Sequence, residues 1–388
     1  TNYLRNGNPN GACEHANVLQ DKYRQTINGL YETKEAADAA TTKVNEIFNH
    51  LRSLAYKPLD TNLEKEIVAQ GEIISTNMVT LYMREKGLDA ELLDSLSFMR
   101  LGANGEPDLA YIRTHLLPQL DLEVKGRIYI AQGFICMNDE GNIDNLQRGG
   151  SDYTATLIGA AVNAEEVQIW TDIDGMHNND PRIVENTSPV HHLHFEELAY
   201  FGAKILHPTC ILPAKLMGTP VRLLNTMDPA AEGTLIDNNL TCPGEIKAIA
   251  AKENITAIKI KSGRMLLAYG FLRKVFEIFE KYKTSIDMIC TSEVGVSVSI
   301  DDKTHLPAIL NELKKLGVVE VDDNMCIICV VGDLDWRNVG FEAIAAEALK
   351  EVPVRMISYG GSNHNISFLV SAHDKKRALE SLSKYLFN

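Results

Sequence analysis

The chain has 388 residues, of which 45% are apolar and 23% are charged, a balance that is typical of a folded protein and too apolar for a disordered one. Its 52 acidic residues outnumber its 38 lysines and arginines, so the formal charge is -14 with neutral histidines. A chain this acidic, with no long basic run, is poorly suited to bind nucleic acid or an anionic membrane. At roughly 100–200 residues per domain the length allows two to four domains, and we expect small-molecule chemistry.

The sequence predicts a cytoplasmic protein. No apolar run approaches the roughly 18–20 residues of a membrane-spanning helix, and the polar opening TNYLRNGNPN lacks the hydrophobic segment of a signal peptide. The seven cysteines are odd in number and scattered, which fits reduced thiols better than disulfides. Cys326 and Cys329 form a C-x-x-C pair, but the apolar run at 325–331 indicates a buried strand, and no second pair completes a zinc site.

The first 240 residues predict an α/β arrangement. Apolar residues at helical spacing predict an initial run of helices at 17–30, 34–54 and 63–86. Strands and helices then alternate, with strands at 127–135, 167–171 and 221–224 and helices at 154–163 and 195–206. This alternation implies a mostly parallel sheet with helices on its faces. The change of composition at 238–245, with a proline and a glycine, predicts a linker.

Beyond this linker the predicted elements occur in two similar series. The first has strands at 257–261, 285–291, 294–300 and 318–321, with helices at 271–282 and 306–316. The second has strands at 325–331, 354–358 and 365–370, with helices at 341–350 and 375–386. Because residues 354–358 also line up with 286–290, we expect an internal duplication of a small βαββαβ module.

The densest chemical pattern is LQRGGSD at 146–152, between a predicted strand and a predicted helix. Gly149 and Gly150 let the backbone approach a ligand, and Ser151 and Asp152 occupy the helix start, where free N–H groups favour an anion. Arg148 adds a planar guanidinium suited to a carboxylate or phosphate. A tight turn capped by serine or aspartate would have the same local sequence, so the motif alone leaves both interpretations open.

Polar side chains also follow the next predicted strand, in the segment WTDIDGMHNNDPR at 170–182. In open α/β sheets, ligands collect at the carboxyl ends of the parallel strands, so this segment and LQRGGSD favour one shared cleft. A third segment, FGAKILHP at 201–208, places Lys204 near a helix end, either as a phosphate ligand or as a surface charge.

His191, His192 and His194 do not predict a metal site. Three histidines within four residues cannot all face one side of a strand or helix, and no carboxylate lies at a typical ligand spacing. We expect ordinary surface or packing roles for them, and no protein metal site.

In order along the chain, six segments resemble the signature segments of aspartokinases. They are GEIIS (71–75), LQRGGSDYTA (146–155), WTDIDGMHNNDPR (170–182), FGAKILHP (201–208), NTMDPAAEGTLI (225–236) and TSEVGV (291–296). The resemblance implies an α/β fold: an amino-acid-kinase three-layer sandwich with a mostly parallel sheet at 1–240, then a regulatory region at 241–388. That region would hold two ferredoxin-like βαββαβ ACT modules, at about 262–323 and at 246–261 plus 324–388. Family members begin with a strand and a Lys-Phe-Gly-Gly-Thr-Ser-like loop, which this chain lacks, so we expect the given chain to start inside the catalytic domain.

The resemblance implies transfer of a phosphoryl group from ATP to the β-carboxylate of L-aspartate, the first step towards lysine, threonine and methionine. A carboxylate is already anionic at neutral pH, so no general base is required. Positive charge and N–H donors must instead offset the repulsion between two anions, with Mg²⁺ held mainly by the nucleotide phosphates. The alternative interpretation is a non-catalytic, effector-binding regulatory subunit of an aspartokinase.

The resemblance also assigns roles to the matching positions of this chain. The catalytic candidates are Lys204, Asp152 and Arg148. The substrate-binding candidates are Glu72, Phe134, Arg148, Gly149, Gly150 and Ser151. The nucleotide-binding candidates are Thr171, Asp172, Asp174, His177, Arg182 and Lys204.

The ACT modules of the family typically bind a free amino acid between modules, beside the first helix. The effector-binding candidates are Met265, Gly270, Phe271, Leu272, Asp287 and Ser292. Phe271 and Leu272 also fit the buried face of a helix, and the two interpretations are compatible because only the helix start has to touch a ligand. We expect lysine as the effector, because Asp287 gives a cation a partner, with threonine second, and a homodimer or larger assembly through the ACT modules.

Overall fold

The computed structural model describes residues 1–146, 149–200, 206–239, 244–263 and 269–387. Its contacts divide the chain into two units, Thr1–Ile169 with Thr209–Val221, and Trp170–Pro208 with Arg222–Asn388. We describe each unit by itself. Among the described residues, no helix combines the length and the apolar character of a membrane span.

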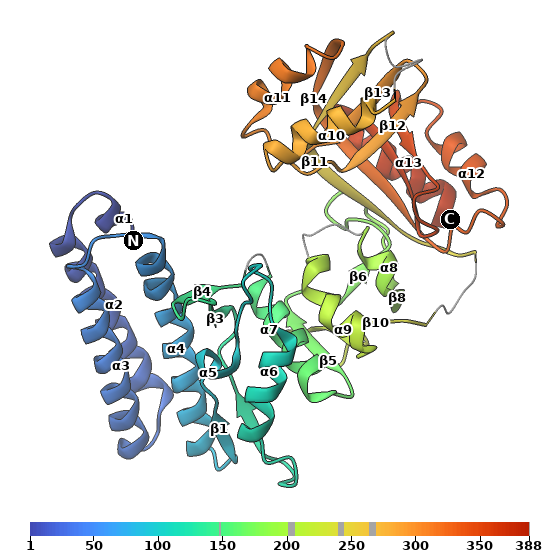
Figure 1. The fold of residues 1–388 in the computed structure, drawn as a ribbon. Helices are drawn as coiled ribbons and strands as arrows, with labels where there is room; N and C mark the ends of the chain where they lie inside the picture. The colour runs from blue at the N-terminus through green and yellow to red at the C-terminus, as the bar shows by residue number, and fades with distance from the viewer. Residues whose placement is uncertain (147–148, 201–205, 240–243, 264–268, 388) are drawn as a thin grey trace. The chain divides into compact units, whose positions relative to one another are not determined.

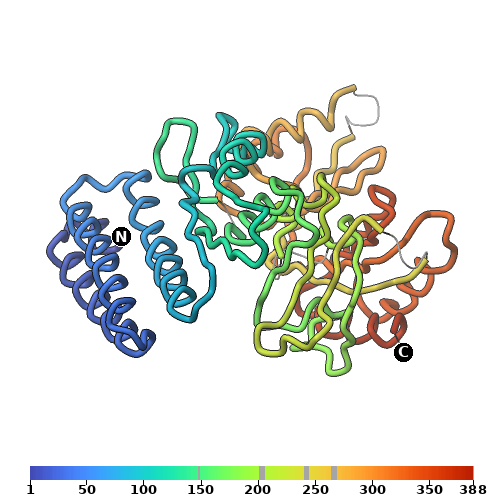
Figure 2. The backbone as a smooth tube through the Cα atoms, turned by 90° about the horizontal axis from the view of Figure 1, so that it is seen from below, coloured from blue at the N-terminus to red at the C-terminus, as the bar shows by residue number. Residues whose placement is uncertain are grey.

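The first unit opens with four helices, of which the three long ones, α2 to α4, run side by side in both views (Figures 1 and 2). They are α1 (Asn2–Arg5), α2 (Pro9–Leu30), α3 (Lys34–Leu54) and α4 (Thr61–Glu85). The side chains of Asn8, Thr33 and Asp60 each accept a backbone N–H at the start of a helix. The predicted helix at 34–54 is confirmed, whereas the one predicted from residue 17 begins at Pro9, because the cap precedes the apolar pattern.

The remainder of the first unit combines short strands with helices. It contains β1 (Ala90–Leu92), α5 (Ser95–Phe98), α6 (Leu109–Leu116), η1 (Leu117–Gln119), β2 (Ile128–Ile130), β3 (Ile135–Met137), β4 (Ile143–Asn145), α7 (Gly150–Val162) and α9 (Leu212–Met217). β1 pairs with β2 in parallel, and β3 pairs with β4 antiparallel. The prediction of one strand at 127–135 is wrong: Phe134 has a φ of 71°, which interrupts the extended backbone between β2 and β3.

A four-stranded sheet has the order β5-β9-β10-β8 and pairs β10 with β8 in parallel. Its strands are β5 (Val167–Thr171), β8 (His192–His194), β9 (Val221–Asn225) and β10 (Thr234–Asp237), and a two-stranded ribbon of β6 (Met176–His177) and β7 (Pro189–Val190) accompanies it. The helix predicted at 195–206 is wrong in length, because α8 (Phe195–Leu198) gives way to a turn at residues 199–200. Residues 201–205 lie outside the described part of the chain.

From β11 onward the chain forms a six-stranded sheet of order β12-β13-β11-β14-β16-β15 (Figure 1). Its strands are β11 (Ile246–Lys261), β12 (Met288–Ser292), β13 (Gly295–Ile300), β14 (Val318–Gly332), β15 (Val354–Ser358) and β16 (Asn365–Ser371). The accompanying helices are α10 (Phe271–Lys281), α11 (Leu306–Leu313), α12 (Phe341–Ala348) and α13 (Lys375–Phe387).

The two predicted modules share their central strands. The sequence suggested a break at the polar residues 322–324, yet β14 runs through them for 15 residues and pairs antiparallel with the 16-residue β11. Asn254 and Asn324 each have a positive φ, 61° and 55°, and the β11–β14 register shifts beside them. Each asparagine therefore forms a bulge in a continuous strand, and at Asn324 the sequence pattern predicts a break between two strands instead.

Alternate side chains of β14 pack into two different apolar cores. Cys326, Ile328 and Val330 pack against α12 and α13, whereas Met325 and Ile327 face an apolar cluster with Met288, Met356 and Leu369. The edge strands β12 and β15 contact each other through the Cys290 thiol, which donates to the Ile357 carbonyl (3.0 Å). The sheet therefore curves around this inner cluster. Burial of Cys326 and Cys329 confirms the prediction that their C-x-x-C lies in a core strand.

Ile328→Ala should destabilise the regulatory half. Ile328 is fully buried, so truncation should lower the free energy of unfolding by about 2–5 kcal/mol through lost burial and a residual cavity. Val321 lies on the same strand but is 37% exposed, so Val321→Ala should cost about 0.5 kcal/mol or less. Urea unfolding followed by circular dichroism measures both; equal shifts would contradict this placement of the core.

Candidate active site

The glycine turn of LQRGGSD begins helix α7. Gly149 is in the left-handed conformation (φ 70°, ψ 26°), and the helix starts at Gly150. Tyr153 N donates to the Gly149 carbonyl, so the first helical hydrogen bond closes on the turn itself. The backbone N–H groups of the first turn, including that of Ser151, are consequently directed to the helix end, where an anion is favoured.

Phe134 packs directly against this helix start. A Cβ added at Gly150 would lie 2.5 Å from Phe134 Cδ2, so only glycine allows the ring its position. Phe134 N donates to Thr154 Oγ1 (2.9 Å), and Thr154 Oγ1 in turn donates to the Gly150 carbonyl (2.8 Å). The predicted substrate residues Phe134, Gly150 and Ser151 thus lie together, since Gly133 also abuts the Ser151 Cβ.

A buried hydrogen-bond network joins this segment to the turn of α4 that carries Glu72. Thr76 Oγ1 donates to the Glu72 carbonyl (2.8 Å) and accepts from Gln132 Nε2 (3.1 Å). Ser95 donates two hydrogen bonds to Gln132. The Ser95 backbone N–H donates to the side-chain Oε1 of Gln132 (2.8 Å), and Ser95 Oγ donates to the backbone carbonyl of Gln132 (2.7 Å). Glu72 and Phe134, which are distant in sequence, are therefore held on adjoining segments.

Sequence reasoning missed Thr76, Gln132 and Ser95. None of them belongs to a recognisable motif, and their partners lie 37 and 56 positions away. The one available indication was a glutamine within the apolar stretch RIYIAQGFI, because a buried amide requires hydrogen-bond partners.

Asp152 lies in the first turn of α7 and is half-buried. Burial raises the pKa of its carboxyl group, because removal of water disfavours the charged form. A cationic partner would lower that pKa again. The two basic catalytic candidates, Arg148 and Lys204, lie outside the described residues.

The predicted nucleotide residues belong to the second unit and form local pairs. His177 Nε2 lies 2.9 Å from Asp174 Oδ1, and its Nδ1 lies 3.0 Å from Thr187 Oγ1. The hydrogen bond with His177 lowers the pKa of Asp174. Thr171 Oγ1 donates to Asp172 Oδ1 (3.1 Å), and the Asp172 side chain is exposed.

Arg182 is held within its own loop. Its Nε and Nη2 donate to the two carboxylate oxygens of Asp180, at 2.9 and 2.7 Å. Arg337 makes the same two-bond contact with Asp335, so the D-x-R sequence forms a local clamp at both places. Arg182 is 74% exposed, so its remaining donors are accessible to a ligand. Since the substrate and nucleotide sets lie in different units, their convergence on one cleft stays a prediction.

The three clustered histidines have separate partners. His192 Nε2 lies 2.8 Å from Asp237 Oδ1, His191 lies 3.6 Å from Glu232, and the His194 ring accepts from Glu196 N at the start of α8. In the part of the chain that the structure describes, no group of three or more His, Cys, Asp or Glu side chains is arranged to hold a metal ion.

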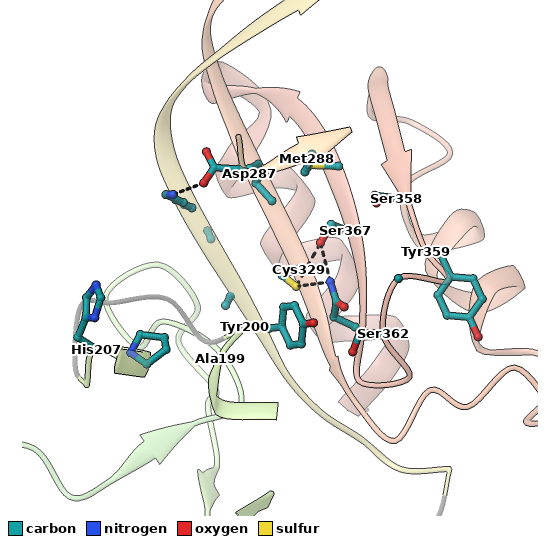
Figure 3. Close-up of a pocket in the computed structure, with 17 residues that line it drawn as sticks. Ala199, Tyr200, His207, Asp287, Met288, Cys329, Ser358, Tyr359, Ser362 and Ser367 are labelled. Carbon is teal, nitrogen blue, oxygen red and sulfur yellow. Dashed lines mark hydrogen bonds and ion pairs between the residues drawn. The ribbon is translucent and has the colours of Figure 1, made fainter. Parts of the chain in front are cut away.

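The described regulatory candidates lie at the start of α10 and at the two ends of β12. Gly270 is left-handed (φ 78°) and begins α10, Phe271 is buried beneath it, and Ser292 ends β12. Asp287 accepts a hydrogen bond from Lys252 Nζ (2.5 Å) and borders a cavity of about 490 Å³ (Figure 3). Of the described effector candidates, only Asp287 lines this cavity, and Met265 lies outside the described residues.

Comparison with known proteins identifies the family. The model described as "Amino acid kinase family" matches residues 10–225, and an "ACT domain" model matches residues 328–386. Lysine-sensitive aspartokinase 3 of Escherichia coli is 32% identical over 387 residues, which is 96% of this chain and 82% of that protein. Aspartokinase 1 of Arabidopsis thaliana is also 32% identical, over 96% of this chain and 69% of its own length. The chain belongs to the aspartokinases.

Solved structures give the same result. E. coli aspartokinase III in complex with aspartate and ADP superimposes with a TM-score of 0.81, over 97% of this chain and 87% of that one, at 32% identity. The aspartate kinase of Clostridium acetobutylicum has a TM-score of 0.83 at 25% identity, over 99% and 87% of the two chains. The expected fold, an amino-acid-kinase domain with C-terminal ACT modules, is confirmed for this aspartokinase, as is its class as an aspartate kinase. The domain boundaries at 240 and within the ACT pair stay predictions.

In this aspartokinase, Thr76→Val should weaken the network behind the substrate set. The change leaves Gln132 Nε2 without its acceptor in a buried position, so the free energy of unfolding should fall by about 1–3 kcal/mol. Thr42→Val is the matched control, because Thr42 donates the same kind of bond to a carbonyl four residues earlier but is not part of this network. The free energy of unfolding should change by about 0.5 kcal/mol or less in this variant. Chemical denaturation of both variants tests the difference, and an unaltered Thr76→Val protein would count against the network.

Proposed function

We propose that this aspartokinase transfers the terminal phosphoryl group of ATP to the β-carboxylate of L-aspartate and releases 4-phospho-L-aspartate and ADP. The observation that carries the proposal is the assembled start of α7, with Phe134, Gly150 and Ser151 in contact, and the hydrogen bonds of Thr76 that join the Glu72 turn of α4 to the segment of Phe134. The E. coli relative that was solved with aspartate and ADP supports the same substrates.

The chemistry requires charge compensation rather than a base. The aspartate β-carboxylate is ionised at neutral pH and attacks the phosphorus directly. Backbone N–H groups at the start of α7 and the Arg148 guanidinium would bind a substrate carboxylate, and Asp152 would accept from the substrate ammonium group or hold a basic residue in place. Lys204 would face the transferring phosphoryl group, where added positive charge stabilises the transition state.

The nucleotide would be bound by the second set, Thr171, Asp172, Asp174, His177 and Arg182. Mg²⁺ would neutralise charge on the phosphate oxygens and would be held mainly by them, because this ion takes few protein ligands in such sites. Asp174 is already paired with His177, so the exposed Asp172 carboxylate is the member of the set better able to add a protein ligand.

The effector proposal is L-lysine, bound at the ACT modules with Asp287 as the partner of a cationic group, and threonine is the second candidate. The E. coli relative is named lysine-sensitive and was also solved with lysine and aspartate, at 33% identity and a TM-score of 0.77. We further propose a homodimer or larger assembly through the ACT modules and a cytoplasmic location.

The second candidate function is a non-catalytic regulatory subunit. The kinase family model covers residues 10–225, which favours a catalytic chain. A coupled assay of ADP release, with the protein expressed from its complete reading frame, decides between the two: aspartate-dependent ADP release supports the kinase, and its absence in protein shown to be folded by circular dichroism supports the subunit.

Arg148→Ala should lower kcat/KM for aspartate by about 30–150-fold, because a charge-assisted carboxylate pair is lost. Lys204→Met should mainly lower kcat, since its charge is required in the transition state. Arg24 lies on α2 in an exposed pair with Asp21, so Arg24→Ala serves as the control for loss of an arginine. Near-normal rates in both test variants would refute the assigned cleft.

Gly150→Ala should impair aspartate binding while ATP binding changes little. The new Cβ collides with Phe134, so the KM for aspartate should rise by about tenfold or more, equivalent to about 1.4 kcal/mol of lost binding. Gly71 precedes Glu72 in α4 and has no atom within 4 Å of an added Cβ, so Gly71→Ala should keep the wild-type KM. Steady-state kinetics with each substrate varied in turn provides the test; a tenfold rise for Gly71→Ala as well would contradict it.

A further inference from the structure

Lys252 on β11 bridges two acidic side chains in the first ACT module. Its Nζ lies 2.5 Å from Asp287 Oδ1 and 2.9 Å from Asp301 Oδ2. The Asp287 side chain is 17% exposed, whereas those of Lys252 and Asp301 are each 43% exposed. The ammonium group therefore sits between a sheltered carboxylate and an exposed one.

Lys252 keeps its positive charge in this position. Burial lowers its pKa, but the hydrogen bonds to Asp287 and Asp301 raise it overall above the ordinary value. Burial raises the pKa of Asp287, and Lys252 opposes that effect. A cation beside the sheltered carboxylate therefore stabilises its charged form, whether that cation belongs to the chain or to a ligand.

The second module has an ion pair at the corresponding place with the charges exchanged. Arg355 aligns with Asp287, and its Nε donates to Asp322 Oδ2 (2.7 Å). Asp322 lies two residues before the bulge at Asn324, as Lys252 lies two residues before the bulge at Asn254. An internal pair therefore fills this position of the sheet in both modules, so a ligand that uses Asp287 has to exchange with a cation already present.

We infer that Lys252 is an internal competitor for the cationic effector: its ammonium group occupies Asp287 in the free protein and moves to Asp301 when the effector binds. This inference rests on the effector role proposed above for Asp287. The exchange leaves every charge paired, because the effector takes over the Asp287 carboxylate while Lys252 keeps the acceptor that it already contacts in Asp301. The affinity for the effector then depends on how much more strongly the effector's cationic group interacts with the Asp287 carboxylate than the Lys252 ammonium group does.

Isothermal titration of L-lysine into the full-length enzyme tests the exchange with three variants. Lys252→Met removes the competitor and should lower the Kd by about threefold to tenfold. Lys252→Arg strengthens the competitor, because a guanidinium can bind one carboxylate through two bonds, and should raise the Kd by about threefold. Asp301→Asn removes the alternative acceptor and should also raise the Kd by about threefold.

Arg355→Met is the matched control, because it breaks the equivalent pair in the second module. It should leave both the Kd for lysine and the uninhibited kcat within about twofold of wild type, the scale of an exposed ion pair. The lysine concentration that half-inhibits the enzyme should change among these variants in the same order as the Kd values.

The opposite pattern would overturn the inference. If Lys252 positioned Asp287 for the effector, Lys252→Met would bind lysine more weakly and Lys252→Arg would restore binding. If Lys252 acted only through its charge at a distance, Lys252→Arg would match the wild type, which also contradicts an exchange. Failure of the wild-type enzyme to bind lysine at all, with normal aspartate-dependent ADP release, would refute the lysine assignment and the exchange but not the kinase function.

Discussion

The catalytic half depends on the contact between the Phe134 ring and the backbone of Gly150. The ring lies where any β-carbon at residue 150 would be, so the loop before β3 and the first turn of α7 can approach only through glycine. Phe134 accepts a positive φ to do so, and its amide is bonded to Thr154 in the same helix. The substrate candidates are consequently placed by backbone contacts as well as by side-chain pairing, and a helix start with free N–H groups is available as one wall of the proposed site.

The regulatory half depends on a different constraint, the continuity of β11 and β14. Each strand belongs to both modules, and the asparagine bulges at 254 and 324 let one strand pass from one module to the next. The two modules are therefore joined through continuous strands rather than through a flexible linker. The paired charges beside each bulge, Lys252 with Asp287 and Asp322 with Arg355, lie at this same crossing.

The aspartokinase identity and the internal duplication were both predictable from the sequence. Short motifs such as LQRGGSD and FGAKILHP have fixed order and spacing, and the aligned segments 286–290 and 354–358 have the same apolar pattern. The helix at 34–54 and the strands at 167–171 and 354–358 were also predicted with their observed bounds, since apolar periodicity and local capping determine such elements. The short helix α8 and the break between β2 and β3 were not predictable, because they depend on what each residue packs against.

The sequence by itself determined the family, the fold class and the residue types available for chemistry, because these follow from local patterns that need no partner. Only the tertiary structure decided that Gln132 and Thr76 connect the segments of Phe134 and Glu72 and that Lys252 occupies Asp287. Hydrogen bonds and ion pairs between distant segments have no sequence period. They exist because the fold brings a donor and an acceptor within about 3 Å of each other, at a depth where neither can be left unpaired without cost.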